Sequence, residues 1–381
     1  MKTNEFTHFL VGGYVTKIAV RRMLNVVAVL SALILAGSVR GAVEAQSPIQ
    51  VIATGLDNPR GLNFGPDGAL YVTEAGRGGS STACAPSPDP PFANRCFGPT
   101  GAITRIGAIG DQRRVVVGLP SIAGPSGAPA QGPVDIDFGL GAAWVTIGFG
   151  GDPANRAPLE AAGARMGRLI RVLSNGQWSD VVDISAHETA TNPDGTTVDS
   201  NPFGLRILPD RALIADPGAN ALLQIGLNGA ISTLAVFPAR AVPSGDRTFQ
   251  SVPTSVAVGA NGEIYVGELT GQPFLVGAAR VYRVPAGGGV PTVVATGFTN
   301  IIDIAVAADG AGYVLEHDAD GILGPGVDGR VIRVNADGAR TVIASAGLVK
   351  PGGLALGPDG ALYVTTRSNS AGIGAVVRIQ P

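Results

Sequence analysis

The chain has 381 residues, of which 45% are hydrophobic and 15% charged, with 56 Gly and 28 Pro. This composition is too apolar for a disordered protein and too rich in turn-forming residues for a helical one, so it favours many short strands. A net charge of -2 and 5% aromatic residues offer neither a basic band for phosphates nor many surfaces for base stacking, which argues against nucleic acid as a partner.

The N-terminal segment is predicted to be a signal peptide. Arg21 and Arg22 precede an uncharged, mostly apolar run over 23–37, which is short for a bilayer-spanning helix. Small residues then predict cleavage between Ala45 and Gln46. A retained anchor and a twin-arginine signal are the alternatives. We therefore expect a secreted or extracytoplasmic protein that has no membrane segment after cleavage.

The predicted mature domain, 46–381, contains two cysteines, Cys84 and Cys96, within a Gly-, Pro- and Ser-rich insertion over 75–101. An exported chain favours a disulfide between them, because a metal pair would lack any nearby His or further Cys. Closing a loop of this size contributes up to about 3 kcal/mol in the chain-entropy account. The predicted disulfide would stiffen an insertion that has no core of its own.

A strand-turn-strand pattern recurs six times along the chain. The nine residues GPDGALYVT occur at 65–73 and again at 357–365, with a Pro-Asp-Gly turn before an apolar strand. The related hairpins are GLGAAWV at 139–145, LPDRALIA at 208–215, GANGEIYV at 259–266 and AADGAGYV at 307–314. The last four of the six start 51, 48 and 50 residues apart. Strand-rich repeats of about 40–50 residues are typical of propeller blades.

Each repeat supplies four candidate strands, which we name A to D, with D the outermost. In the fifth repeat they cover 303–307, 312–315, 329–334 and 340–344. The mature chain opens with a segment, 50–56, that matches D strands, and it closes with a segment, 375–379, that matches C strands. The sequence therefore predicts an all-β, six-bladed propeller in which the N-terminal strand completes the last blade and no sheet edge stays open.

The predicted connections differ in length between the two faces of the disc. Turns from A to B and from C to D are mostly tight, whereas the long connections all fall on the opposite face, which we call the long-loop face. Loops of such length in a compact domain usually serve binding or are disordered. We expect the site, for a small molecule or a protein, on the long-loop face.

Polar residues are expected to surround the channel mouth on this face. The B strands end in Glu74, Asp216, Glu268 and Glu316, and the starts of the A strands carry Arg60, Asp135 and Asp303, with Asn201 just before. Candidate ligand-binding residues are Arg60, Glu74, Asp135, Asp303 and Glu316. Candidate metal ligands are Asn201, Asp216 and Glu268, because calcium takes six to eight oxygens. The alternative is structural: a carboxylate that ends a B strand can accept hydrogen bonds from loop amides.

Glu268 and His317 are the candidate catalytic residues, as acid/base groups. His317 would need an orienting partner and a substrate within reach, whereas a plain loop residue needs neither. Two short stretches, Asp318 to Gly321 and Asp194-Gly195 with Asp199, resemble fragments of calcium loops but lack the rest of the ligand series. The sequence contains no serine-centred elbow and no phosphate cradle.

The stretch VIATGLDNPRGLNFGPDGALYVTEAGRGG at 51–79, followed by the cysteine-containing insertion and GAITRI at 101–106, resembles the ScyD/ScyE family. These are exported bacterial proteins associated with scytonemin-type pigment clusters. The resemblance extends from residue 47 to the end of the chain. It implies an exported, NHL-like propeller with a role in a late extracytoplasmic step of secondary metabolism, and it carries no catalytic residues over.

Two classes of function follow. The first is a monomeric, non-catalytic binding or scaffold propeller, which the scarcity of histidine and the lack of a nucleophile motif favour. The second is a calcium-dependent hydrolase, lactonase or lyase, because the chain also resembles the gluconolactonase and strictosidine-synthase-like propellers. In that case the metal ligands or acid/base groups would be Glu74, Asn201, Asp216, Glu268 and Asp303.

Overall fold

The computed structural model describes residues 48–88, 93–108, 110–243 and 245–381. The predicted signal peptide and its cleavage site lie outside the described residues. In the described ranges, no helix has the length and apolar character needed to cross a membrane.

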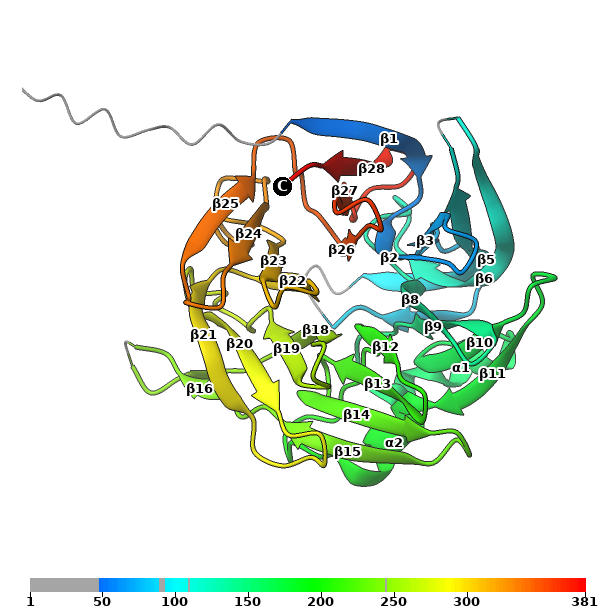
Figure 1. The fold of residues 1–381 in the computed structure, drawn as a ribbon. Helices are drawn as coiled ribbons and strands as arrows, with labels where there is room; N and C mark the ends of the chain where they lie inside the picture. The colour runs from blue at the N-terminus through cyan, green and yellow to red at the C-terminus, as the bar shows by residue number, and fades with distance from the viewer. Residues whose placement is uncertain (1–47, 89–92, 109, 244) are drawn as a thin grey trace, which may run out of the picture. The chain divides into compact units, whose positions relative to one another are not determined.

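Six antiparallel sheets are arranged in a ring as the blades of a propeller (Figure 1). Blade 1 consists of β2 (Pro59–Phe64), β3 (Leu70–Glu74), β5 (Asn94–Ile106) and β6 (Gln112–Ala123). Blade 2 consists of β8 (Pro133–Gly139), β9 (Ala142–Ile147), β10 (Arg168–Val172) and β11 (Trp178–Asp183). Blade 3 consists of β12 (Leu205–Ile207), β13 (Arg211–Asp216), β14 (Ala221–Gly226) and β15 (Ile231–Val236).

Blades 4 to 6 repeat this order from the inner strand A to the outer strand D. Blade 4 consists of β18 (Pro253–Val258), β19 (Ile264–Glu268), β20 (Ala279–Val284) and β21 (Thr292–Phe298). Blade 5 consists of β22 (Ile301–Val306), β23 (Gly312–Glu316), β24 (Arg330–Val334) and β25 (Arg340–Ala344). Blade 6 consists of β26 (Gly353–Leu356), β27 (Leu362–Thr366), β28 (Gly374–Ile379) and β1 (Ile49–Leu56).

The ring closes through the two ends of the domain, which confirms the predicted closure. Strand β1 pairs antiparallel with β28, from Ile49 opposite Ile379 to Leu56 opposite Gly374. Figure 1 shows the first strand, in blue, beside the last, in red. The other three strands of blade 6 come from the C-terminal end of the chain. Strand β1 adds the fourth, outer strand, so the edge of β28 is paired.

The repeated nine residues form the same contacts in both copies. In blade 1 the Tyr71 hydroxyl donates to Asp67 Oδ2 at 3.1 Å, and in blade 6 the Tyr363 hydroxyl donates to Asp359 Oδ2 at 3.0 Å. An arginine from the neighbouring C strand pairs with each aspartate, at 2.9 Å in blade 1 and 2.7 Å in blade 6. Phe64 packs edge-on against Tyr363 across the closure, with ring centroids 5.0 Å apart. The two copies therefore lie in neighbouring blades.

Threonine hydroxyls join neighbouring blades near the channel. In four places a threonine Oγ1 donates at 2.7 Å to a backbone carbonyl of the next blade: Thr73 to Val134, Thr146 to Phe203, Thr254 to Ile301 and Thr365 to Arg60. Each hydroxyl therefore satisfies a buried backbone acceptor, and apolar side chains fill the space between the blades further out.

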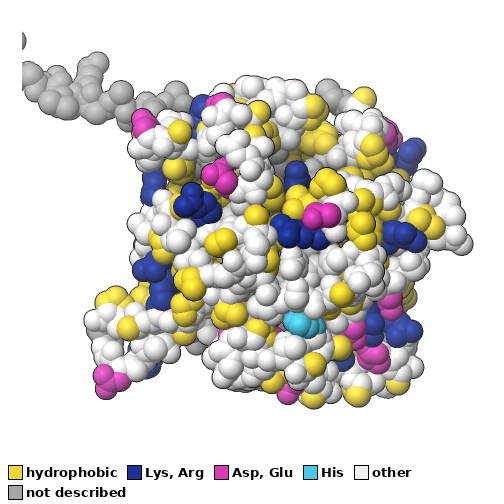
Figure 2. Space-filling view, turned by 60° about the horizontal axis from the view of Figure 1, so that its bottom comes forward, with side chains coloured by type: hydrophobic (Ala, Val, Ile, Leu, Met, Phe, Trp, Pro, Cys, Tyr) yellow, Lys and Arg dark blue, Asp and Glu magenta, His cyan; other side chains and the backbone are white. Residues whose placement is uncertain are grey.

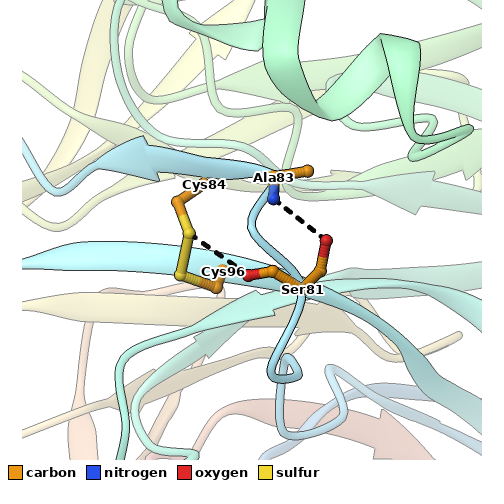
Figure 3. The surroundings of a disulfide bond; sticks show 4 residues. All are labelled: Ser81, Ala83, Cys84 and Cys96. Carbon is orange, nitrogen blue, oxygen red and sulfur yellow. Dashed lines mark hydrogen bonds between the residues drawn. A yellow bond between two sulfur atoms is a disulfide. The ribbon is translucent and has the colours of Figure 1, made fainter.

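The insertion of blade 1 contains the predicted disulfide, which is confirmed between Cys84 and Cys96 (Figure 3). The insertion is more regular than the sequence predicted: residues 94–101 extend β5, which pairs with β6 and with β4 (Cys84–Pro86). Arg95 then fastens the insertion to blade 2 by donating to the carbonyls of Phe149 at 2.8 Å and Gly150 at 2.8 Å.

Further short elements occur in the long connections, which the sequence had predicted only as loops. These are β7 (Ala130–Gln131), η1 (Pro153–Arg156), α1 (Ala157–Ala161), α2 (Ile184–Thr191), β16 (Arg240–Ala241) and β17 (Thr248–Phe249). Asp183 caps α2 by accepting from the Ala186 amide at 3.0 Å. All these elements belong to D-to-A or B-to-C connections and so extend the long-loop face.

Candidate functional site

A cavity of about 280 Å³ lies in the central channel. Its lining comes from the middle and C-terminal parts of the A strands, including Asn63, Asp135, Arg206 and Asp303. Because the A strands run from the long-loop face toward the tight A-to-B turns, this cavity lies on the side of the tight turns. The sequence had placed the site at the opposite, long-loop mouth of the channel.

Asp135 and Asp303 come from blades 2 and 5, which stand opposite each other in a ring of six. Asp135 accepts from its neighbour Ile136 N at 2.8 Å and from Leu205 N of blade 3 at 2.7 Å. Asp303 accepts in the same way from Ile304 N at 2.8 Å and from Leu354 N of blade 6 at 2.7 Å. Backbone amides of two blades therefore hold each carboxylate in place.

The two carboxylates also influence each other's charge. Burial, and next the charge of Asp303, raises the pKa of Asp135 well above its usual range. Burial raises the pKa of Asp303 to about 7. A pair of this kind holds a proton near neutral pH, since two negative charges in a shared, poorly solvated space repel each other. A protonated aspartate of this pair can donate a hydrogen bond to a ligand, and an ionised one can accept a hydrogen bond.

The backbones of neighbouring A strands pack closely on the long-loop side of these aspartates, in a zone that we call the neck. A Cβ added at Gly61 would lie 2.2 Å from Asp135 Oδ1 and 2.8 Å from Asp135 Cα. A Cβ at Gly353 would lie 2.7 Å from the Arg60 carbonyl, and one at Gly204 would lie 2.7 Å from the Thr254 carbonyl. The A strands approach so closely here that only glycine fits.

Above this neck, Arg60 and His317 are buried and have protein partners. Arg60 donates to the Ala130 carbonyl at 2.8 Å and to Asn369 Oδ1 at 3.1 Å, and burial lowers the pKa of Arg60 to about 10. His317 Nδ1 contacts the Pro351 carbonyl at 2.7 Å, which requires the proton on Nδ1. Burial lowers the pKa of His317 to about 4, so the ring is neutral at physiological pH.

The carboxylates that end the B strands are fully buried and point to protein partners. Glu74 pairs with Arg114 at 2.6 Å and accepts from Asp57 N at 2.7 Å. Glu268 accepts from Arg240, Ser251 and the Tyr282 hydroxyl, the last at 3.0 Å. Glu316 pairs with Arg330 and accepts from Thr299 N at 2.7 Å. The cavity lining includes none of these three carboxylates.

Blade 3 differs from these three blades because Asp216 accepts only from neutral groups. These donors are Ser200 Oγ at 2.8 Å, Asn201 N at 2.7 Å, Gly218 N at 3.0 Å and Ala219 N at 3.3 Å. The Asn201 side-chain oxygen accepts from Phe149 N at 3.2 Å. The predicted metal ligands Asn201 and Asp216 are therefore neighbours in blade 3, and Glu268 lies in blade 4. Within the described ranges, no group of three or more His, Cys, Asp or Glu residues is arranged to hold a metal ion.

Sequence reasoning missed the second carboxylate of blade 2, Asp137, which is buried. It accepts from Asn63 Nδ2 at 2.8 Å and from Ile207 N at 2.7 Å, and so links blades 1, 2 and 3. Residues two apart on a strand share a face, so the spacing of Asp135 and Asp137 was a usable signal. On the face shown in Figure 2, basic and acidic side chains are interspersed rather than gathered into one continuous charged area.

The fold and the cavity define a class: a six-bladed β-propeller with a polar central channel. Solved structures of this class resemble the chain. They include regucalcin, described as a calcium-binding protein, from Agrobacterium tumefaciens strain C58 (13% identity, 87% of this chain and 93% of that one covered, TM-score 0.50). They also include a putative gluconolactonase (14%, 88% and 93%, TM-score 0.50) and a glucose dehydrogenase (12%, 88% and 99%, TM-score 0.52).

At these identities the likeness shows the fold alone. No protein-family model matches the chain, and no curated protein sequence matches it. The resemblance to the ScyD/ScyE family stays a prediction from the sequence.

Proposed function

We propose that this protein is an exported binding propeller of the ScyD/ScyE type that takes a small, hydrogen-bond-donating molecule into its central channel. The observation that carries the proposal is the pair Asp135 and Asp303, which line one cavity from opposite blades. An ionised carboxylate has about four lone-pair sites. Backbone amides use two on each aspartate, so the others are available to hydroxyl or ammonium groups of a ligand.

The cavity limits the ligand to a small and polar molecule. Its volume of about 280 Å³ lies just below the usual range of small-molecule sites, which begins at about 300 Å³. A sugar, a polyol or a compact amine fits this combination of size and charge better than a large aromatic pigment does. The family resemblance implies that such a ligand takes part in a late extracytoplasmic step of secondary metabolism. A protein partner would instead use the long-loop face.

The confirmed disulfide fits an oxidising compartment, which supports export. Calorimetry tests the binding proposal with a panel of monosaccharides, polyols and primary amines. We expect one member to bind the wild type, and to bind the Asp303→Asn variant about tenfold or more weakly. The Asp246→Asn variant, which changes an exposed carboxylate, is the matched control. Binding that is equal in both variants would contradict a role of the channel carboxylates.

A second candidate is catalysis by the same pair, which the raised pKa of Asp303 favours. With its pKa at about 7, Asp303 can hold a proton while its partner is ionised, which is the requirement for acid and base groups in lactone hydrolysis or in a lyase reaction. Hydrolysis of a simple lactone that disappears in Asp303→Asn would establish catalysis.

A further inference from the structure

Glu188 is a buried carboxylate whose surroundings differ from those of the other buried carboxylates. It lies on the inner side of α2, the helix that connects blade 2 to blade 3, and it is 1% exposed. Neither Oε1 nor Oε2 has a hydrogen-bond partner among the described residues. A charged group in this state is costly, since it loses its water without replacement. A bound cation would compensate the charge of such a group.

Other carboxylates are the main charged neighbours of Glu188. Burial, and next the charges of Asp216, Asp194 and Asp199, together raise the pKa of Glu188 to about 7. The backbone amide of Asp199 also acts on the Glu188 carboxylate and lowers its pKa in part. The three aspartates whose charges act on Glu188 come from the end of β13 and from the segment between α2 and β12.

Short contacts tie these segments together. Ser185 Oγ on α2 donates to Ser200 Oγ at 2.9 Å, and Ser200 Oγ donates to Asp216 Oδ2 at 2.8 Å. Asn220 Nδ2 donates to Asp194 Oδ2 at 2.8 Å. Next to these carboxylates, the chain at Gly218 passes so close to Asp199 Oδ1 that an added Cβ would lie 2.7 Å away. The acidic residues thus belong to one packed unit.

The other blades show what is different here. The buried carboxylates that end the B strands of blades 1, 4 and 5 each pair with an arginine: Glu74 with Arg114, Glu268 with Arg240 and Glu316 with Arg330. Asp216 holds the same position in blade 3 and accepts only from backbone amides and Ser200. Blades 1, 4 and 5 thus place an arginine beside the buried carboxylate. Blade 3 instead has a second buried carboxylate, Glu188, on the helix that leads into it.

We propose that Glu188 is the main ligand of a calcium site between α2 and blade 3, beside Asp216 and separate from the channel. Calcium accepts carboxylate, amide and carbonyl oxygens in irregular geometry, so it does not need the preformed set of three carboxylates that the described residues lack. Asn192, at the end of α2, offers a further buried oxygen, Oδ1, without a partner. Asp194 and Asp199 are partly exposed, which gives the ion a route to the site. The ion replaces the arginine of the other blades.

Calcium titration of the full chain, stripped of metal with a chelator, tests the site. We expect calorimetry to show one ion bound and thermal melting to show a higher Tm with calcium than without. In Glu188→Gln the affinity falls about tenfold or more. Without metal, the same variant melts higher than the wild type, because it removes an uncompensated buried charge. If Glu188→Gln does not fold, Asp194→Asn at the partly exposed rim is the second variant.

Two controls separate this site from the channel. Asp303→Asn alters the channel and should bind calcium like the wild type, and so should the exposed Asp246→Asn. Calcium binding that is lost in Asp303→Asn but kept in Glu188→Gln would overturn the proposal and place the ion in the channel. A wild-type protein that binds no calcium at about 10 mM would overturn it as well. Neither result depends on whether the channel binds a sugar, a polyol or an amine.

Discussion

The carboxylate of Asp303 accepts a hydrogen bond of 2.7 Å from the backbone N–H of Leu354 and so joins blades 5 and 6 at the channel wall. Asp135 makes the equivalent bond from blade 2 to Leu205 of blade 3, also at 2.7 Å. Asp135 and Asp303 thus have two roles. Their carboxylates join neighbouring blades, and they also supply the charge of the cavity. The predictions below separate the two roles.

The first prediction concerns the pH dependence that Asp303 confers on stability. Burial raises its pKa from 3.8 to about 7, so the folded state binds the proton more tightly than the unfolded state. The contribution to stability is therefore complete below pH 3.8 and is lost as the pH rises to about 7, on the order of 4 kcal/mol. Denaturant unfolding at several pH values should show a steeper fall in the wild type than in Asp303→Asn, in which the buried Asp135 still titrates. An equal slope in both proteins would contradict the raised pKa.

His317 should produce the opposite dependence. Burial lowers its pKa from 6.5 to about 4, so the unfolded state binds the proton more tightly. The stability that neutral His317 contributes is present above pH 6.5 and is lost as the pH falls to about 4. His317→Gln keeps a donor for the Pro351 carbonyl and should remove this loss. The free energy of unfolding of both proteins between pH 4 and pH 8 provides the measurement.

Gly61→Ala tests the narrow neck of the channel. The new Cβ would lie 2.8 Å from the backbone of Asp135, so blades 1 and 2 would have to move apart. We expect a loss of about 3 kcal/mol in the free energy of unfolding. Gly124→Ala is the matched control, because its Cβ meets nothing within 4 Å. Equal stability of the two variants would show that the blades are not in contact at the neck.

Glu268→Gln separates a structural carboxylate from a ligand-binding one. The change leaves Arg240 without its charged partner in a buried site, and we expect a loss of about 3 kcal/mol in stability. Affinity for a ligand of the channel should stay at the wild-type value, because Glu268 does not line the cavity. A variant that keeps its stability but loses affinity would show that Glu268 contacts the ligand, as the sequence suggested.

The disulfide should stabilise the insertion of blade 1. Cys84 and Cys96 are 12 residues apart, and opening a loop of that size costs up to about 3 kcal/mol in the chain-entropy account. A reducing agent should lower the Tm of the wild type and leave the Cys84→Ser/Cys96→Ser double variant unchanged. Reduction without any effect on the wild type would show that the contacts of Arg95 alone hold the insertion.

The amino-acid sequence was sufficient for the ring of strands because each signal for it is local. A Pro-Asp-Gly turn and its apolar strand lie within nine residues, and the D-like start and C-like end of the domain identified β1 and β28 as partners. The disulfide could be predicted for the same reason, since it joins two neighbouring cysteines in one insertion. The short helices were missed because they lie in irregular connections with few apolar positions.

Which carboxylates face the channel was decided only by the tertiary structure. Glu74, Glu268 and Glu316 follow their strands in the same way along the chain, yet each turns to an arginine from another element. Glu188 formed part of no sequence pattern, and only the fold brought its charge near that of Asp216. A strand pattern follows from the backbone of a few consecutive residues, whereas the partner of a buried charge comes from whichever segment the folded chain brings beside it, often tens of residues away.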